Sequence, residues 1–313
     1  DLPRARRLSE TAEIVLFERG PFVSFANCGL PYYVGNVIKK EEDLLVAGPA
    51  RFREQFNIEV RLENEVLSID RAASAIEVKE LTTGKIYRES YDALVLAPGA
   101  APIRPPLPGL DAPGVFALRT IPDSRNIKEW IAAKKAKDAV IVGGGFIGME
   151  MAENLALAGL KVSILEMQAQ VLPPFDPEMA GAVHRHLEAK GVELFLGDAL
   201  AGIEKGPGGR LTVATKAGRK LPADLALLSL GVRPESNLAK ECGLPLGARG
   251  GIHVDEHMRT ADAKIWAVGD AAEARDYVTG EAVMVPLAGP ANRQGRIAAD
   301  NIFGKPAVFR GVQ

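Results

Sequence analysis

Short apolar runs alternate along the chain with segments of helical periodicity. Residues 139–142 (Ala-Val-Ile-Val) form an unbroken apolar run that is typical of a buried strand. Residues 149–160 carry apolar side chains at helical spacing and end near Gly159, and a second apolar run over residues 161–165 is closed by Glu166. These lengths predict a β-α-β unit with parallel strands, and therefore a fold of the α/β class.

The same order of elements recurs, because each copy has a strand closed by a glutamate, a β-hairpin and a strand that ends near glycine. The first copy consists of residues 12–17 with Glu18, a hairpin at Gly84, and residues 93–97 with Pro98 and Gly99. The second copy consists of residues 161–165 with Glu166, a hairpin at Gly218, and residues 225–229 with Gly231. This repetition predicts two nucleotide-binding units that are built alike.

The order of the remaining segments predicts that the second unit is inserted into the first. A proline-rich crossing over residues 102–113 leaves the first unit, and the chain returns through residues 231–235. An apolar strand over residues 265–268 then leads to Gly269 and Asp270. We therefore expect a discontinuous outer domain.

Three glycines between the first predicted strand and helix form the pattern G-x-G-x-x-G: Gly143, Gly145 and Gly148. In dinucleotide-binding units the first glycine permits a tight turn, the second lets the backbone approach a pyrophosphate, and the third allows close helix–strand packing. The helix start adds the positive end of its dipole. Glu166 is placed to bind the adenosine ribose hydroxyls and to repel a 2′-phosphate, which predicts a preference for NADH over NADPH.

Glu18 has the corresponding place for a second adenine dinucleotide, and Asp270 follows a strand where a ribitol or phosphate-proximal hydroxyl would lie. Two dinucleotides in one chain predict a flavin that receives electrons from a nicotinamide. Glu166 lies 18 residues after Gly148, and the same count back from Glu18 reaches position 0. We therefore expect the chain to begin after its first glycine loop, with residues 4–8 as the tail of the helix that this loop opens.

Cys28 is the candidate redox residue. The segment of residues 27–31 (Asn-Cys-Gly-Leu-Pro) places its thiol just before a predicted helix, since proline is favoured in the first turn. A helix N-terminus favours a thiolate, whereas a lone cysteine in an apolar setting is usually a small buried hydrophobe. Cys242 has no polar, glycine-flanked setting of this kind, and we interpret it as structural. Neither has a CxxC partner, which argues against a disulfide scaffold or a cysteine-rich zinc site.

Composition and charge narrow the classes of function. With 38 basic and 40 acidic side chains, the formal net charge of −2 gives no electrostatic footprint for nucleic acid or an acidic membrane surface. No stretch reaches the ~18 uncharged apolar residues of a membrane span, and no signal peptide opens the chain. We therefore expect a cytoplasmic protein. The four histidines do not form a metal-ligand pattern, so no metal site is predicted.

The chain resembles the flavin-dependent pyridine nucleotide–disulfide oxidoreductases, and within them the single-cysteine coenzyme A-disulfide reductase branch, which includes NADH-dependent persulfide and polysulfide reductases. The segments that carry the resemblance are residues 24–32 (Ser-Phe-Ala-Asn-Cys-Gly-Leu-Pro-Tyr), 96–100, 142–150, 231–234, 267–270 and 286–294. They span nearly the whole chain. The resemblance implies two Rossmann-like three-layer domains, with an NAD(P)H-binding domain at residues 104–228 inserted into an FAD-binding domain made of residues 1–103 and 229–313. It also implies a dimerisation domain beyond residue 313, and hence a full-length homodimer.

The resemblance further implies that Cys28 is the redox thiol between FAD and a sulfur substrate, which would be coenzyme A disulfide, a persulfide or a polysulfide. NADH is the expected electron donor and NADPH the second candidate. Cofactor contacts are expected from Glu18, Val66, Pro98, Gly99, Gly143, Gly145, Phe146, Ile147, Gly148, Glu150, Glu166, Gly231, Gly269, Asp270, Leu287 and Ala288.

Substrate contacts are expected from Arg7, Ser24, Asn27 and Asn292. From charge alone, the basic run that contains Arg7 would be a solvated helix face, and the resemblance instead makes Arg7 a phosphate ligand. A lysine that some members place after the cysteine segment falls near Phe56 in this chain.

Two alternatives remain open from the sequence. An NADH oxidase or peroxidase would cycle Cys28 through a sulfenic acid. A non-catalytic NAD-binding fragment would bind NADH without a flavin, since the first glycine loop lies outside the chain. The absence of a Cys-x4-Cys pair argues against glutathione- and lipoamide-type reductases.

Overall fold

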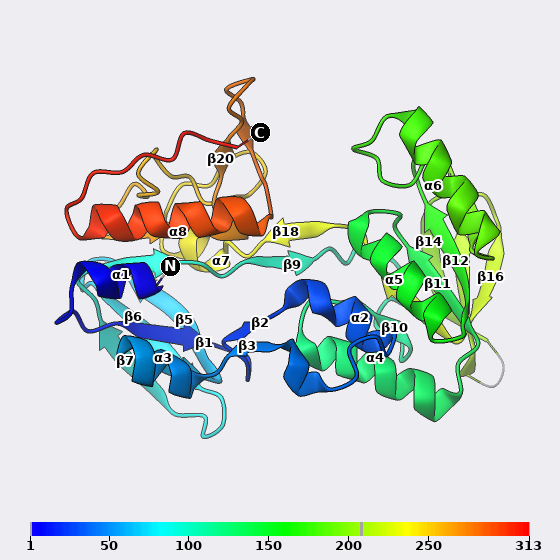
Figure 1. Cartoon of the computed structure of the whole chain (residues 1–313), viewed down its shortest axis with the longest axis horizontal. Coiled ribbons are helices and arrows are strands. Elements are labelled where there is room, and N and C mark those ends of the chain that lie inside the picture. The colour runs from blue at the N-terminus through cyan, green and yellow to red at the C-terminus, as the bar shows by residue number, and fades with distance from the viewer. Residues whose placement is uncertain (1, 207–208, 313) are drawn as a thin grey trace. The chain divides into compact units, whose positions relative to one another are not determined.

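The computed structural model describes residues 2–206 and 209–312, so the outermost bounds of the predicted domains, residues 1 and 313, lie outside it. The chain folds as two compact units (Figure 1). Among the described residues, the first unit is discontinuous and contains 2–25, 47–101 and 233–312, and the second contains 26–46, 102–206 and 209–232. The segment of residues 102–232 thus lies between two parts of the first unit, and residues 26–46 pack with the second unit. The domain ranges 1–103, 104–228 and 229–313 stay a prediction.

The second unit contains a parallel sheet of five strands in the order β10-β17-β11-β12-β13. These strands are β10 (Val115–Phe116), β17 (Leu225–Leu228), β11 (Asp138–Val142), β12 (Lys161–Glu166) and β13 (Glu193–Leu196). The helices of this unit are α2 (Leu30–Val34), α4 (Ile121–Lys134), α5 (Phe146–Leu157) and α6 (Pro177–Ala189). The central strands β11 and β17 are almost wholly apolar and buried, as expected for a sheet covered on both faces.

The predicted β-α-β unit is β11, α5 and β12, in which Val142 pairs with Leu165. The helix begins at Phe146, three residues earlier than the apolar periodicity predicts, because Gly145 is its N-cap. It ends at Leu157, and Gly159 follows with φ +88°, the left-handed conformation common after helix ends.

A three-stranded antiparallel sheet also belongs to the second unit: β14 (Leu200–Lys205), β15 (Leu211–Thr215) and β16 (Lys220–Ala223). The predicted hairpin at Gly218 joins β15 to β16, with Gly218 at φ +84°. Leu211 and Val213 of β15 are buried in one apolar cluster with Val140 and Val142 of β11. The small sheet therefore shares a core with the large one.

The first unit repeats this plan. Its elements are α1 (Leu2–Leu8), the parallel pair β1 (Val15–Glu18) and β4 (Glu59–Leu62), α3 (Pro49–Phe56), the antiparallel sheet β5 (Asn64–Asp70), β6 (Ala75–Glu80) and β7 (Ile86–Ser90), the parallel pair β8 (Leu94–Leu96) and β19 (Ile265–Ala267), α7 (Asn237–Glu241) and α8 (Ala288–Ile302). The strand predicted over residues 12–17 begins only at Val15, because Ala12 N–H donates to the Ser9 hydroxyl in a turn after α1 (3.1 Å).

The glutamates that close β1 and β12 adopt the same local geometry. Glu18 Oε1 accepts a hydrogen bond from Gly20 N–H at 2.6 Å, and Glu166 Oε1 accepts one from Gln168 N–H at 2.8 Å. Each glutamate is followed by a parallel partner strand, a three-stranded antiparallel sheet and a returning strand. The predicted repetition is thus present in both the order of elements and the side-chain geometry.

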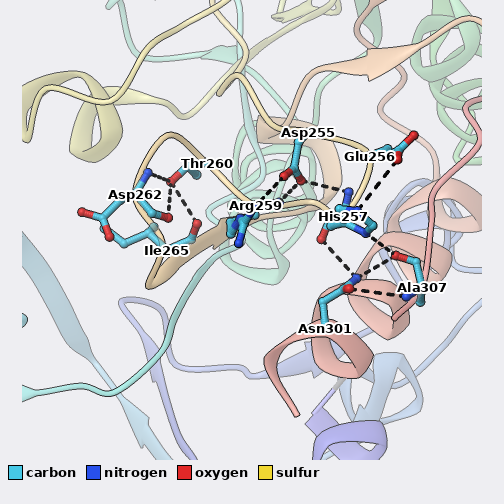
Figure 2. A network of polar contacts seen from close by, with 9 residues as sticks. All are labelled: Asp255, Glu256, His257, Arg259, Thr260, Asp262, Ile265, Asn301 and Ala307. Atoms are coloured by element: carbon cyan, nitrogen blue, oxygen red, sulfur yellow. Dashed lines mark hydrogen bonds and ion pairs between the residues drawn. The ribbon is translucent and has the colours of Figure 1, made fainter. Parts of the chain in front are cut away.

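The segment after α8 is fixed to the first unit by polar contacts (Figure 2). Asn301 Nδ2 and His257 Nδ1 both lie 2.8 Å from Ala307 O. Two residues further on, Phe309 is buried against Trp266 and Ile297. These contacts hold α8 and the loop around His257 together.

The remaining elements are short: β2 (Ser24–Phe25), β3 (Leu45–Ala47), β9 (Ala100–Pro102), β18 (Val232–Pro234), β20 (Ala274–Arg275), β21 (Ala282–Val283), and the 3-10 turns η1 (Asn27–Gly29), η2 (Glu41–Leu44) and η4 (Gly269–Ala271). In the ranges that the structure describes, no helix combines the length and apolar character needed to cross a bilayer.

Candidate functional site

The glycine loop after β11 has a distinct geometric requirement at each of its three glycines. Gly143 has φ +108°, and a Cβ there would lie 2.3 Å from Ser229 O. A Cβ on Gly148 would lie 2.1 Å from Gly143 O, so only glycine permits this packing of α5 on the loop. A Cβ on Gly145 would meet no described atom within 4 Å. The backbone at Gly145 is therefore open to a ligand.

The N-terminus of α5 is suited to bind an anion. Its N-cap, Gly145, provides no side-chain cap, so its first backbone N–H groups are available to an acceptor. Phe146 and Ile147 in the first turn are exposed. A helix of 12 residues that starts without a side-chain cap at an open glycine would present the positive end of its dipole to a bound phosphate.

Glu166 is held rigidly beside this loop. The residue is 6% exposed, and its Oε2 accepts a hydrogen bond from Gly144 N–H at 2.6 Å while Oε1 accepts one from Gln168 N–H. A carboxylate has about four acceptor positions, so two remain for hydroxyl donors. Because both oxygens are fixed by backbone N–H groups, the negative charge cannot turn away from an incoming phosphate.

Glu150 lies on α5, about one turn after its first residue, Phe146. Burial raises the pKa of its carboxyl, and the nearby charge of Glu153 raises it further. Gly231, another predicted cofactor residue, lies in the loop after β17 at φ +88°, and its carbonyl accepts a hydrogen bond from Ile103 N–H. All these residues belong to the second unit.

Cys28 is exposed in the turn η1, directly before α2. Proline stands at the start of α2, as the sequence predicts, and the helix has only five residues. The exposure of the thiol argues against the alternative that Cys28 is a small buried hydrophobe. Asn27 is exposed beside it.

Two polar contacts fasten the Cys28 segment to α4. Glu41 and Arg125 form a two-point ion pair at 2.6 and 2.8 Å, and this hydrogen bonding lowers the pKa of the Glu41 carboxyl. Lys128 Nζ lies 3.3 Å from Tyr33 O and 4.0 Å from the centre of the Tyr33 ring. Burial raises the pKa of Tyr33 and lowers that of Lys128.

Sequence reasoning missed these four residues. The partners are separated by 84 and 95 positions, and none of the four residues belongs to a local motif. Only a charge pattern shared between distant segments could have indicated them. The second unit thus holds the exposed thiol by contacts that no local motif contains.

Cys242 differs from Cys28 in every respect that matters for reactivity. It is half-buried, its thiol lies 3.3 Å from Ala239 O, and burial raises its pKa. These features suit a structural residue.

In the first unit, several predicted cofactor residues gather at strand ends. Gly269, at φ +75°, donates its N–H to Gln294 Oε1 at 2.8 Å, and Asp270 follows in η4. Gly99, at φ +77° after the exposed Pro98, accepts a hydrogen bond from Glu235 N–H. Val66 is half-buried against the core of this unit.

Helix α8 begins much as α5 does. Its N-cap, Leu287, provides no side-chain cap, and both Leu287 and Ala288 are exposed. The helix has 15 residues, so its N-terminus offers free N–H groups and a dipole end to an electron-rich group. These features fit an adenine dinucleotide. The carboxylates of Glu18 and Asp270 could bind its hydroxyl groups, and the N-terminus of α8 could stabilise an electron-rich ring system.

A cavity of about 390 Å³ lies in the first unit, and Ser24 and Asn292 both line it. Helix α1 contributes Leu2 and Pro3 to the same wall, and Arg7 follows Pro3 by one turn on that helix.

The three arginines of α1 have different surroundings. Arg4 pairs with Asp300 at 2.6 Å, and Arg6 donates to Ser9 O at 3.0 Å and Asn57 O at 2.7 Å. Arg7 is exposed and has no polar partner among the described residues. Arg7 is therefore available to a phosphate. In the part of the chain that the structure describes, no group of His, Cys, Asp and Glu side chains could hold a metal ion.

Comparisons with known proteins identify close relatives. Residues 3–295 match the family described as pyridine nucleotide-disulphide oxidoreductase. Among solved structures, reduced CoADR-RHD of Bacillus anthracis is 46% identical with a TM-score of 0.96. The match covers 99% of this chain and 56% of the chain of that structure. An NAD-dependent persulfide reductase from A. fulgidus is 37% identical with a TM-score of 0.95, over 99% of this chain and 58% of its own.

A protein of Methanocaldococcus jannaschii named NADH oxidase is 37% identical over 309 residues, which are 98% of this chain and 68% of that protein. The chain therefore spans little more than half the length of the two solved structures and about two thirds of this relative.

Proposed function

Since the chain belongs to the pyridine nucleotide-disulphide oxidoreductase family, we propose that it is the core of a flavoprotein that passes electrons from NADH through FAD to Cys28, which reduces a sulfur substrate. The observation that carries this proposal is the contrast between the two thiols. Cys28 is exposed at a helix start, whereas Cys242 is half-buried with a raised pKa. A single reactive thiol suffices when the substrate supplies the second sulfur.

The chemistry assigned to Cys28 is thiol–disulfide exchange. The Cys28 thiolate attacks one sulfur of the substrate, the substrate S–S bond breaks, and the first thiolate product leaves. Cys28 and the second half of the substrate then share a mixed disulfide. Two electrons that originate in NADH, with one proton, break that bond, regenerate the Cys28 thiolate and release the second thiol.

Each unit would hold one of the two dinucleotides. Gly145, the N-terminus of α5 and Glu166 would hold NADH, and Glu18, Asp270 and the N-terminus of α8 would hold FAD. FAD, when bound, supplies the two-electron relay between nicotinamide and sulfur. The fixed carboxylate of Glu166 supports NADH as the preferred donor, with NADPH as the weaker one.

Coenzyme A disulfide, coenzyme A persulfide and polysulfide are the proposed substrates. The solved relatives named CoADR-RHD and persulfide reductase support this class of substrate. The cavity lined by Ser24 and Asn292, with the unpartnered Arg7 one turn away from its wall, supports recognition of a phosphate-bearing thiol such as coenzyme A. Asn27 would contact the sulfur substrate beside Cys28. Phe56 stands where a lysine contact is expected in some relatives, so Arg7 would carry more of the phosphate recognition.

The test uses the FAD-loaded chain, NADH and coenzyme A disulfide. Cys28→Ser should abolish disulfide reduction and preserve NADH-dependent reduction of an artificial dye, because dye reduction does not require the thiol. Cys242→Ser is the matched control and should preserve both activities. Disulfide turnover by the Cys28→Ser variant would contradict the proposal.

An NADH oxidase or peroxidase is the second candidate, because a relative that is 37% identical carries the name NADH oxidase. In that reaction Cys28 would be oxidised by peroxide to a sulfenic acid and reduced back by two electrons from NADH. Rates of oxygen and peroxide consumption, compared with coenzyme A disulfide reduction in the same preparation, separate the two functions. Faster peroxide consumption that depends on Cys28 would favour this candidate.

The absorption spectrum distinguishes a non-catalytic NAD-binding module from the two flavoprotein candidates, the reductase and the oxidase or peroxidase. A yellow preparation with a flavin spectrum supports the flavoprotein, and a colourless chain that still binds NADH supports the module. We also propose that the complete protein is a cytoplasmic homodimer, in keeping with two free cysteines and the sequence resemblance. Sedimentation of the complete protein would test the dimer.

A further inference from the structure

We propose that His184 is a positioning residue for the NADH site, because it fixes the backbone of a segment that packs on the glycine loop. This inference rests on the proposed function, in which Gly143–Gly148 bind the cofactor. His184 lies on α6, and its Nε2 accepts a hydrogen bond from Val171 N–H at 3.1 Å. The segment in question is residues 168–175, between β12 and α6.

The 168–175 segment contacts the glycine loop directly. Leu172 N–H donates to Gly144 O at 2.8 Å, and Val171 is fully buried. A Cβ on Gly144 would lie 3.0 Å from Val171 Cγ1, so the Val171 side chain lies close against the loop backbone. Gly144 is also the residue whose N–H binds Glu166. A displacement of Val171 would therefore shift both the loop backbone and the Glu166 carboxylate that is proposed to bind the ribose.

The segment also reaches the start of α5. The Phe175 ring contacts the Phe146 ring edge-on, with centroids 6.2 Å apart. Gln170 Nε2 donates to Phe175 O at 2.8 Å, and Phe175 N–H donates to Leu172 O at 2.9 Å. The turn is thus closed on itself and contacts the cofactor site at two points.

The backbone of this turn needs an external support. Leu172 has φ +50°, a left-handed conformation that costs a non-glycine residue free energy and persists only where its surroundings enforce it. Two successive peptide N–H groups precede the Leu172 Cα: Val171 N–H donates to His184 Nε2, and Leu172 N–H donates to Gly144 O. His184 therefore ties the strained turn to α6 at the residue next to the one that Gly144 ties to the loop.

The role requires an acceptor at Nε2, which an imidazole with its proton on Nδ1 provides and a leucine does not. Glutamine places its amide oxygen four bonds from Cα, as histidine places Nε2, and so it retains the acceptor. His186 is a matched control, because it lies on the same helix, is exposed, and its side chain has no hydrogen bond within the described residues.

The experiment measures the dissociation constants of NADH and of ADP-ribose for the unaltered chain and for the variants His184→Leu, His184→Gln and His186→Leu. We expect His184→Leu to weaken both ligands about fivefold, the factor that corresponds to the loss of one neutral hydrogen bond. His184→Gln and His186→Leu should bind like the unaltered chain. In steady-state kinetics, His184→Leu should raise KM for NADH and leave kcat unchanged, because the lost contact stabilises the bound cofactor equally in the ground state and the transition state.

Amide exchange gives a second readout that does not depend on ligand. The Val171 amide should exchange faster in His184→Leu and at the unaltered rate in His184→Gln. Unchanged binding in His184→Leu, an equal loss in His186→Leu, no rescue by glutamine, or an unchanged Val171 exchange rate would each overturn the inference. Absence of ADP-ribose binding by the unaltered chain would instead refute the proposed cofactor site, and with it this role of His184.

Discussion

The contact between α2 and α5 gives a sharp prediction for a single methyl group at Gly35. A Cβ on Gly35 would lie 2.4 Å from Asn154 Oδ1 and 2.8 Å from Asn154 Cβ. Asn154 is fully buried, and its Nδ2 donates to Glu150 O at 2.7 Å, so the side chain is anchored. Gly35 has φ −76°, which alanine adopts without strain. The effect of Gly35→Ala is therefore steric.

The magnitude follows from two opposing effects. Glycine-to-alanine substitution at a compatible backbone position stabilises a protein by about 0.4–1 kcal/mol through the unfolded state. Overpacking of a close contact costs about 1–3 kcal/mol. Because a separation of 2.4 Å cannot be accommodated without movement of Asn154 or α2, we expect the steric effect to win. Gly35→Ala should lower the free energy of unfolding by about 1–2 kcal/mol.

Urea denaturation measures this change, and Gly181→Ala is the matched control in the same unit. Gly181 lies within α6, and the nearest atom to its Cβ position is Arg185 Nη1 at 3.7 Å, so alanine should stabilise the helix by about 0.5–1 kcal/mol. The two substitutions should thus change stability in opposite directions. An unchanged or higher stability for Gly35→Ala would refute the packing argument.

The same perturbation has a functional consequence, because α2 follows the Cys28 turn directly. Gly35→Ala should slow reduction of coenzyme A disulfide while NADH binding stays unchanged. Asn154→Ala in the same chain removes Oδ1 and Cγ but leaves Cβ, so it should restore part of the lost stability. Strict additivity of the two substitutions would contradict the direct contact.

Three further predictions follow from single residues. Glu166→Ala should lower the preference for NADH over NADPH by about tenfold or more, as expected for the loss of a charged acceptor, and an unchanged ratio of kcat/KM values would contradict this. Arg7→Ala should raise KM for coenzyme A disulfide about tenfold with little change in kcat, whereas Arg6→Ala should lower the unfolding midpoint instead. The ion pair with Arg125 lowers the pKa of Glu41, so its stabilisation is complete above the unfolded-state pKa and is lost as pH falls through the lowered folded-state pKa. The unfolding midpoint of Glu41→Gln should accordingly fall less than that of the unaltered chain over this acidic range.

Local patterns made much of the fold predictable. The apolar runs of β11 and β12, the glycine loop between them and the glutamate that ends β12 lie within 29 consecutive residues, 138–166. Short-range sterics and hydrogen bonds decide these features. The repeated order of elements then predicted the first unit, in spite of its different sequence.

The parts that could not be predicted depend on contacts between distant segments. Nothing near Cys28 indicates that its segment is fastened by Arg125, and nothing near Gly35 indicates that Asn154 fills the space beside it. His184 likewise has no motif around it. These residues act through tertiary packing, which leaves no periodic signal in a single sequence.

Labelling with coenzyme A disulfide determines whether Cys28 alone carries the exchange with the sulfur substrate. After removal of excess reagent, mass spectrometry should find coenzyme A attached to Cys28, and NADH added to the FAD-loaded chain should release it in equal amount. Cys28→Ser should acquire no label. Attachment to Cys242, or a label on Cys28 that NADH fails to release, would show that Cys28 is not the sole thiol of the exchange.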